Sequence, residues 1–345
     1  MFRSELASVV LSDHQQQSEK NKSQYPHLLL LAEKTYSCQD DQNETLTYPH
    51  MPTFIIAGAQ KSGTTSLYNI LKSNPSLFSF PKVESHFFDF HFSNSLSSLS
   101  DGDICSKGYE YSQTFKATSE QNDGVINGSL LAFEKTPWYI MDPHIPEKIH
   151  KTCPWGPKII ITLRNPIDRA YSHFMMDKKR YYTHEGYNIT FSEKIEQDFE
   201  MLKKHDVVKG ESLDSATAGI WNTNRTYGIF RSNSLMRGLY AEQLKLWHGF
   251  FPLGEQMMVI QYEKFKTNRT KVYNEVLEFI GAPPHIISEN DMAVNLGPDI
   301  KDNRLRIADP SSVEDETRKL LSAFYKPYND DLADLLGEQW RSIWD

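Results

Sequence analysis

A strand–loop–helix unit near residue 60 constrains the fold of this chain more than any other feature of its sequence. The apolar run over residues 53–57 ends at Gly58, a pattern that predicts a short buried strand. A helical pattern follows over residues 64–72, and Asn74-Pro75 should end it. A loop between a strand and a helix presents backbone N–H groups and the positive end of the helix dipole. The sequence therefore predicts an anion site at the end of this strand.

The loop resembles a Walker A motif with a displaced lysine. Gly58 and Gly63 have the spacing of that motif, in which a lysine and a hydroxyl residue follow the second glycine. Here Lys61 stands inside the loop, whereas a nucleotide hydrolase needs its lysine on the β- and γ-phosphates. We therefore expect a 5′-phosphate whose bridging group reacts, and an ordinary strand–helix turn is the alternative. The phosphate-binding candidates are Lys61, Ser62, Gly63, Thr64, Thr65 and Ser66.

A second phosphate signal follows the clearest strand of the chain, over residues 158–163. Arg164 ends that strand, where ligands gather on open α/β sheets. Ser172 should lie two helical turns further, roughly 10 Å along the helix axis, a distance that a guanidinium can span. Arg164 and Ser172 could therefore share one phosphate. Together the two loops describe a nucleotide with separate 5′- and 3′-phosphates.

Apolar strands alternate with helical patterns along the chain. Further strands are expected at 130–133 and 257–261, and helices from Pro166 and at 191–204, 235–248, 270–280 and 313–336. This alternation implies a three-layer α/β/α fold with a central parallel sheet. We expect an irregular, polar N-terminal stem over residues 1–51, a loop over 93–128, and one domain over 52–345.

Composition excludes several classes of protein. The net charge of -8 argues against a general nucleic-acid binder, but not against a local basic cleft. No run of about 18 apolar residues occurs, so no membrane span is expected. Residues 1–17 also lack the apolar stretch of a secretory signal. The 3 cysteines allow at most one disulfide and lack zinc-site spacing, so we expect no metal.

Sequons for N-glycosylation favour a lumenal protein, whereas the lack of a secretory signal favours a cytoplasmic one. They occur at Asn21, Asn43, Asn127, Asn188, Asn224 and Asn268. Coincidence in a chain rich in Ser, Thr and Asn is one interpretation, and a glycosylated lumenal protein is the other. Without a signal or anchor in the sequence, a cytoplasmic location stays the alternative.

The two phosphate motifs together resemble the sulfotransferases that use 3′-phosphoadenosine 5′-phosphosulfate (PAPS). Residues 61–66 look like their 5′-phosphosulfate loop, and residues 164–172 look like their 3′-phosphate motif. Residues 82–89 are similar to the K-E-x-H-F-F-D segment of Golgi heparan and chondroitin sulfotransferases, with Val83 separating the Lys and Glu. Residues 133–139 and 237–252 resemble two further motifs of that group. The tail over 316–337 is most like the 6-O-sulfotransferase that acts on 4-sulfated GalNAc.

This resemblance covers residues 52–345 and implies a P-loop-like sulfotransferase fold. It also implies PAPS as the donor, the desulfated nucleotide PAP as the product, no metal, an anionic glycosaminoglycan-like acceptor and a Golgi lumen. Sulfuryl transfer needs a base for the acceptor hydroxyl and cations on the leaving phosphate. The resemblance places the base at Glu84. His86 is the rival base, because residues two apart in an extended segment share one face.

The remaining roles follow from the same resemblance. Lys61 should stabilise the leaving phosphate, and Lys135 should neutralise the sulfuryl group or position the acceptor, with a solvated lysine as the alternative. A C-terminal loop closes over the nucleotide in related enzymes, often with a disulfide, but no cysteine follows Cys153 here. Candidates for the charge of that loop are Lys301, Arg304 and Arg306.

The acceptor side is less readable from sequence. Aromatic residues that would form either sugar-stacking walls or core are Phe87, Phe88, Trp138 and Tyr139. Residues 178–182 form a basic and aromatic cluster that suits an anionic sugar or a solvated helix end equally. A small molecule or a tyrosine is the alternative acceptor. A kinase would need a lysine after Gly63, and a non-catalytic glycan-binding protein would not need an intact base.

Overall fold

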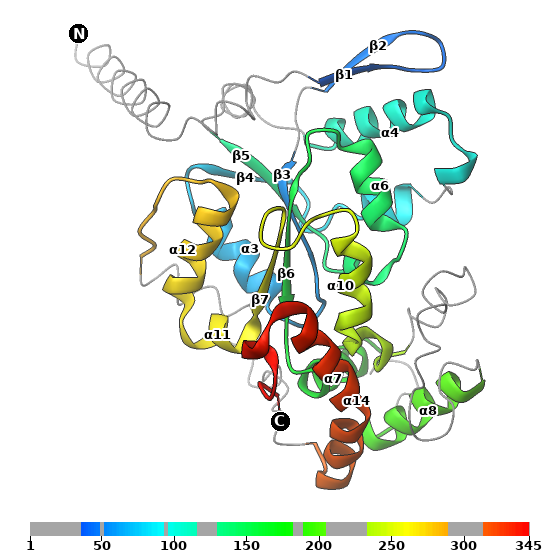
Figure 1. Cartoon of the computed structure of the whole chain (residues 1–345), viewed down its shortest axis with the longest axis vertical. Helices are drawn as coiled ribbons and strands as arrows, with labels where there is room; N and C mark the ends of the chain where they lie inside the picture. Colours follow the sequence, from blue (N-terminus) through cyan, green and yellow to red (C-terminus); the bar gives the residue numbers. More distant parts are fainter. Residues whose placement is uncertain are drawn as a thin grey trace.

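The computed structural model describes residues 36–48, 52–92, 96–115, 130–181, 189–204, 233–288 and 313–344. Five strands form one parallel sheet in the order β4-β5-β3-β6-β7. Their bounds are β3 (Pro52–Gly58), β4 (Leu77–Ser79), β5 (Leu131–Lys135), β6 (Lys158–Leu163) and β7 (Met257–Gln261). Helices lie on both sides of this sheet (Figure 1), which confirms the predicted three-layer α/β/α architecture.

Alternation of side chains along the strands produces two cores. Phe54 and Ile56 of β3 point to one face, where they pack with α3 (Thr64–Lys72) and α12 (Arg269–Ile280). Ile55 and Ala57 point to the other face. The short α11 (Tyr262–Thr267) adds to the first side. The second side is covered by α4 (Asp101–Gln113), α6 (Ile145–Thr152) and α10 (Tyr240–His248). Because β3 is buried on both faces, its sequence is a continuous apolar run.

A third cluster supports the helix that follows β6. It packs α7 (Pro166–Tyr181) against α8 (Phe191–Lys204) and α14 (Asp315–Leu336), largely through aromatic residues such as Phe174, Phe191 and Phe324. These helices lie together at the lower end of Figure 1. Pro166 begins α7, where the missing N–H of proline costs no helical hydrogen bond.

The predicted strands and helices agree closely with the observed elements. The helices predicted at 64–72 and 191–204 have the same bounds as α3 and α8. The strand predicted at 130–133 runs instead from Leu131 to Lys135, and the helix predicted at 235–248 is divided. A short 3₁₀ turn, η5 (Met236–Gly238), precedes α10 in that region. The other short elements are η1 (Phe87–His91), η2 (Leu96–Ser98), η3 (Tyr139–Met141) and η9 (Glu338–Trp340).

Two segments expected to be irregular contain regular structure. Residues 36–48 form a hairpin of β1 (Tyr36–Gln39) and β2 (Thr45–Tyr48), and α4 occupies part of the expected 93–128 loop. The disulfide Cys38–Cys105 joins the hairpin to α4 across a sequence separation of 67. In the chain-entropy model, closing a loop of this size stabilises the fold by about 4 kcal/mol. The domain boundary at residue 52 stays a prediction.

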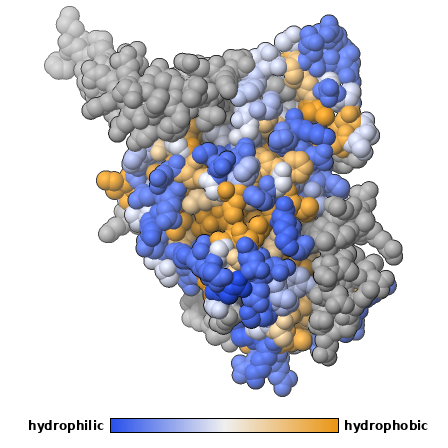
Figure 2. All heavy atoms as spheres, viewed as in Figure 1, coloured by the Kyte–Doolittle hydropathy of each residue, from blue (hydrophilic) through white to orange (hydrophobic). Residues whose placement is uncertain are grey.

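The surface of the face viewed in Figure 1 is mostly hydrophilic. Figure 2 shows apolar side chains near its centre, with hydrophilic ones around them. Among the described helices, none has the length and apolar character needed to cross a membrane.

Candidate active site

The carboxyl ends of three neighbouring strands each carry a cation. Lys61 follows β3, Lys135 is the last residue of β5, and Arg164 directly follows β6. In the sheet β3 lies between β5 and β6. After β3 the chain adds β4 and β5 on one side of this strand, and then β6 and β7 on the other side. Ligands of open α/β sheets bind outside such a topological switch point. The fold therefore brings three of the predicted site residues to one edge of the sheet.

The backbone of the phosphate loop has an unusual conformation. Lys61 has φ 70° and Gly63 has φ 82°, both in the left-handed region. Gly63 must lack a side chain, because a Cβ there would lie 2.6 Å from the Tyr262 ring. The left-handed conformation is strained for a lysine, and such strain is concentrated at functional sites. Ser62 is fully buried, and its hydroxyl has no hydrogen-bond partner of standard geometry among the described residues.

Tyr262 and Arg164 join the two phosphate motifs. The Arg164 guanidinium lies 5.0 Å from the centroid of the Tyr262 ring, the same ring that covers Gly63. Its Nη1 donates to the carbonyl of Lys61 at 3.4 Å, and the Tyr240 hydroxyl donates to the Arg164 carbonyl at 2.8 Å. Arg164 and Ser172 are both buried. Sequence reasoning missed Tyr262, although its position directly after β7 marks it as a strand-end residue.

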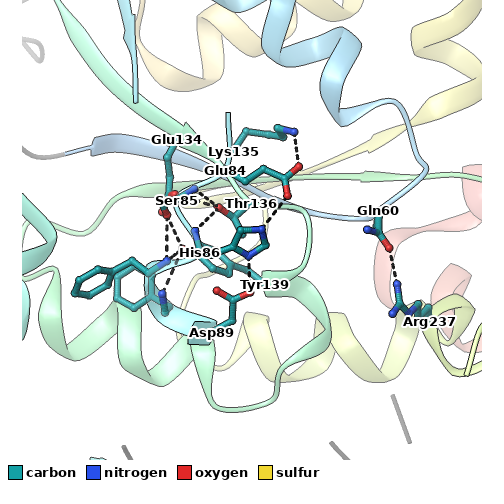
Figure 3. Close-up of polar contacts among 12 residues, drawn as sticks. Gln60, Glu84, Ser85, His86, Asp89, Glu134, Lys135, Thr136, Tyr139 and Arg237 are labelled. Atoms are coloured by element: carbon teal, nitrogen blue, oxygen red, sulfur yellow. Dashed lines mark hydrogen bonds and ion pairs between the residues drawn. The ribbon is translucent and has the colours of Figure 1, made fainter. Parts of the chain in front are cut away.

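Arg237 connects three motifs that are far apart in sequence. Its guanidinium lies 4.4 Å from the centroid of the Trp138 ring, and its Nη1 donates to Gln60 Oε1 in the phosphate loop (Figure 3). The same nitrogen is 3.4 Å from Nε2 of His173, the neighbour of Ser172. Burial and then the charge of Arg237 hold the pKa of His173 well below its ordinary value, so the imidazole is neutral and can accept this hydrogen bond. The sequence marked Arg237 only as part of a motif without a role.

The Glu84 carboxylate lies between two positively charged groups (Figure 3). Lys135 Nζ donates to its Oε1 at 2.7 Å, and His86 Nε2 lies 3.1 Å from its Oε2. His86 Nδ1 is 2.8 Å from Oδ2 of the buried Asp89. Lys135 is 1% exposed, whereas the Glu84 side chain is 34% exposed. An ionised carboxylate has about four lone-pair sites, so Glu84 retains acceptor capacity on its exposed side.

These contacts shift two pKa values in opposite directions. Burial alone would raise the pKa of Glu84, but the hydrogen bonds and charges of His86 and Lys135 outweigh it and lower that pKa below its ordinary value. The hydrogen bond to Asp89, followed by the one to Glu84, raises the pKa of His86 to about 9. At neutral pH the site therefore holds an ionised Glu84 beside a protonated His86.

Two hydroxyl groups after β5 hold the backbone of residues 82–92, which we call the Glu84 segment. Thr136 Oγ1 accepts from the N–H of Ser85 at 3.2 Å, and the Tyr139 hydroxyl accepts from the N–H of Phe87 at 3.0 Å. The Tyr139 hydroxyl also lies 2.8 Å from Ser85 Oγ. The loop that carries Lys135 therefore also positions Glu84 and His86.

A buried carboxyl group lies beneath these hydroxyls. Glu134 is 0% exposed and accepts hydrogen bonds from the Tyr111 hydroxyl at 2.6 Å and from Thr136 Oγ1 at 3.2 Å. Burial raises the pKa of Glu134, and the hydrogen bonds from Ser85, Tyr111 and Thr136 only partly oppose this effect. Glu134 lies within the motif over residues 133–139, but its contact with Thr136 could not be foreseen from the sequence.

The expected aromatic walls belong mostly to the core. Phe87, Phe88 and Tyr139 are at most 3% exposed. The rings of Phe87 and Phe88 in η1 pack against Tyr111, and Tyr139 in η3 packs against Phe88. Of the two alternatives for these three residues, the structure therefore supports the core and not the sugar-stacking wall. Trp138 is partly buried beneath Arg237. The exposed aromatic residue of the segment is instead Phe90, which the sequence did not single out.

Several predicted residues lie outside the description of the site. Lys301, Arg304 and Arg306 fall outside the described residues, as do Tyr182 and the side chains of residues 179–181. Lys178 belongs to α7, where its Nζ lies 5.6 Å from the Phe174 ring centroid. Thr64 is buried, Ser66 is partly buried and Thr65 is exposed at the start of α3.

Known proteins similar to this chain share one domain type. A model of the sulfotransferase domain family matches residues 51–295. The mouse bifunctional heparan sulfate N-deacetylase/N-sulfotransferase 4 is 25% identical over 87% of this chain, which spans 32% of that protein. The membrane-associated sulfotransferase kil1 of Dictyostelium discoideum is 23% identical over 84% of this chain and 66% of that protein. The crystal structure of a sulfotransferase from Alicyclobacillus acidocaldarius superimposes with a TM-score of 0.53 at 23% identity, covering 84% of this chain and 98% of that one.

Proposed function

Because this chain belongs to the sulfotransferase domain family and is an enzyme of that type, we propose that it transfers a sulfuryl group from PAPS to a carbohydrate hydroxyl. The observation that carries this proposal is the Glu84 carboxylate, which is ionised, partly exposed and held between Lys135 and His86. It lies at the end of the sheet that also carries Lys61 and Arg164. Relatives named for heparan sulfate support a carbohydrate acceptor of the glycosaminoglycan type. The identity of the acceptor as 4-sulfated GalNAc stays a prediction.

The nucleotide would bind across the two phosphate motifs. The loop over residues 61–66 suits the 5′-phosphosulfate, because it leads into the start of α3, where backbone N–H groups and the positive end of the helix dipole favour an anion. Arg164 and Ser172 suit the 3′-phosphate, and a guanidinium offers the planar set of donors that a phosphate accepts. Lys301, Arg304 and Arg306 stay the candidates for a loop that covers the nucleotide.

In the proposed reaction the acceptor oxygen attacks sulfur as the bond from sulfur to the phosphate oxygen breaks. Glu84 accepts the proton of the acceptor hydroxyl. Lys61 stabilises the negative charge that develops on the leaving phosphate, and Lys135 neutralises the sulfuryl group by contact with one of its equatorial oxygens. The products are a sulfate ester, PAP and the proton that Glu84 took up and then releases to solvent, so charge and atoms balance without a further reactant.

Glu84 is a better candidate than His86 for the base. A protonated imidazole has no lone pair for a proton, and the pKa of His86 is raised to about 9 by Asp89 and Glu84. His86 is then a positioning residue, which orients Glu84 and transmits the charge of Asp89. Its two nitrogens are both engaged by carboxylates, which suits that role.

The nucleotide assignment predicts that Arg164→Gln removes the preference for a 3′-phosphate. Calorimetry should show that the wild-type protein binds PAP more tightly than adenosine 5′-phosphate by about 10- to 100-fold, as one or two charged hydrogen bonds would give. Arg164→Gln should bring the two affinities together. Arg318→Gln is the control, because Arg318 pairs with Asp168 on the surface at 3.5 Å. Failure of the wild-type protein to bind PAP would refute the donor assignment.

The same protein is then supplied with radiolabelled PAPS and a panel of chondroitin, dermatan, heparan and simple phenols. Label in a polysaccharide supports the carbohydrate acceptor, and label only in phenols replaces it with a small-molecule acceptor. PAP binding without transfer to any acceptor would favour a non-catalytic glycan-binding protein. Transfer of phosphate from ATP with Mg²⁺ would favour a kinase.

We also propose that the protein matures in the secretory pathway and acts in the Golgi lumen. The Cys38–Cys105 disulfide needs an oxidising compartment, and the sequon at Asn43 lies on the exposed turn of the hairpin. Protein isolated from its native cells should yield a linked Cys38–Cys105 peptide under non-reducing conditions. Asn43→Gln should remove one glycan that peptide N-glycosidase F releases from the wild-type protein. Recovery of the protein with both cysteines reduced and no glycan would indicate a cytoplasmic location.

A further inference from the structure

The Glu84 segment leaves two large apolar side chains in solvent. Val83 is 54% exposed and Phe90 is 47% exposed, whereas the neighbouring Phe87, Phe88 and Phe92 are almost completely buried. A single exposed apolar residue needs no explanation, but these two lie on one short segment around a catalytic candidate. Three of the four phenylalanine rings of this segment are buried, and the ring of Phe90 is exposed.

Phe90 has a defined position rather than a loose one. Its ring stacks on the His86 imidazole, with centroids 4.8 Å apart and planes inclined by 27°. His86 in turn is fixed by Glu84 on one nitrogen and by Asp89 on the other. A stack of this kind is stabilised further when the imidazole is charged. The exposed ring is therefore held one side chain away from the Glu84 carboxylate.

We propose that Val83 and Phe90 form an acceptor shelf, which binds the apolar face of a pyranose ring while a hydroxyl of that ring reaches Glu84. The proposal rests on the proposed function and names a binding surface for its acceptor. A pyranose has C–H groups on its faces and hydroxyls at its rim, so a ring lying on the shelf presents its rim toward the carboxylate. Apolar contact combined with a few placed polar groups is the usual composition of such sites.

The exposure of the acceptor shelf favours a polysaccharide over a free small molecule. Small ligands bury most of their surface in a pocket, whereas about half of Val83 and Phe90 remains in contact with solvent. A sugar within a long chain needs contact on one face only, because the neighbouring sugars add further contacts. Lys82 and His91, which flank the shelf in sequence, are exposed and basic or weakly basic, which suits an anionic chain.

The acceptor shelf predicts that Phe90→Ala raises KM for the polysaccharide acceptor by about three- to tenfold, with kcat nearly unchanged. Phe90→Tyr should retain the wild-type KM, because it keeps the ring. Val83→Ser should raise KM less, since it removes a smaller contact. PAP affinity should stay unchanged in all three variants, which also shows that they fold. The control is Leu320→Ala, because Leu320 is 49% exposed and lies on α14, a helix that packs against α7 and α8.

Two outcomes would overturn the acceptor shelf while the proposed function stands. An unchanged KM in both Phe90→Ala and Val83→Ser would show that the acceptor binds elsewhere. A lower kcat with a shifted pH profile and a normal KM in Phe90→Ala would show that the ring only positions His86. Failure of the wild-type protein to sulfate any sugar would instead contradict the proposed function itself.

Discussion

Glu84→Gln should lower kcat by about 10²- to 10⁴-fold, the contribution of a positioned general base. Glutamine keeps the shape of the side chain but has no site that takes up the proton of the acceptor hydroxyl. PAP affinity should change little, because Glu84 belongs to the acceptor side of the proposed site. Single-turnover transfer from PAPS, with PAP affinity measured on the same sample, separates loss of chemistry from loss of donor binding.

Glu147→Gln is the matched control for the base. Glu147 is paired with Lys151 at 2.8 Å and is 39% exposed, which is close to the 34% of Glu84 in its pair with Lys135. Removing this pair on α6 should leave kcat unaltered. Near-normal turnover in Glu84→Gln would move the base to another residue, and His86→Ala would then show whether the imidazole supplies it.

The pH dependence of the wild-type rate carries the same information. As pH falls, the rate should decrease when Glu84 becomes protonated, below the ordinary carboxyl range because His86 and Lys135 lower its pKa. As pH rises through about 9, His86 loses its proton and its hydrogen bonds to Asp89 and Glu84 weaken. Because the pKa of His86 is higher in the folded protein than in the unfolded chain, its protonation adds to the free energy of unfolding. This contribution is fully present below the unfolded pKa, near 6.5, and is lost as pH rises through about 9. Glu84→Gln should abolish the acid limb.

Lys61→Ala should lower kcat by about 10²- to 10³-fold, the usual cost of removing one donor from a developing negative charge. The lysine has a left-handed backbone conformation inside the loop, and in the proposed reaction its ammonium stabilises the bridging oxygen. The loss should be larger in kcat than in PAPS affinity, because the negative charge on the bridging oxygen develops only as the bond to sulfur breaks, and PAP, which carries that charge, should also bind more weakly. Donor binding and turnover measured together test this difference.

Lys72→Ala, at the opposite end of α3, is the control for Lys61. Lys72 is exposed and lies 5.9 Å from the centroid of the Tyr68 ring, so its removal takes one positive charge from the same helix without touching the loop. Lys61→Arg restores charge but not shape. Full activity in Lys61→Ala would assign stabilisation of the leaving group to another cation, such as Lys135.

Four strands of the sheet, β3, β5, β6 and β7, could be predicted from sequence because they are short apolar runs, whereas the three-residue β4 was not predicted. The β1–β2 hairpin could not, since a two-stranded ribbon is marginal alone and here depends on Cys38 pairing with Cys105. Helix α4 contains two glycines and few apolar residues, so its pattern is faint. One signal was present: Ser100 and Asp103 form a capping box at its start.

The candidate site was predictable as residue types but not as a geometry. Motifs pointed to Glu84, His86 and Lys135, whereas the contact of Glu84 with a lysine 51 positions away depends on β5 and the following loop. The same holds for Arg237, which meets Gln60 across 177 positions. Burial separated the aromatic residues of the segment, and only tertiary packing decides which of four similar phenylalanines stays outside. The roles assigned to these residues stay predictions.

The Thr136 and Tyr139 hydroxyls hold the segment of the candidate base through backbone N–H groups, and this has a consequence for engineering. Every residue except proline has the same backbone N–H, so these hydrogen bonds do not depend on which side chains the segment exposes to solvent. Positions 83, 90 and 91 can therefore be exchanged as a set while the chemistry beneath them is retained. A library confined to these positions would vary what the enzyme accepts without rebuilding how it reacts.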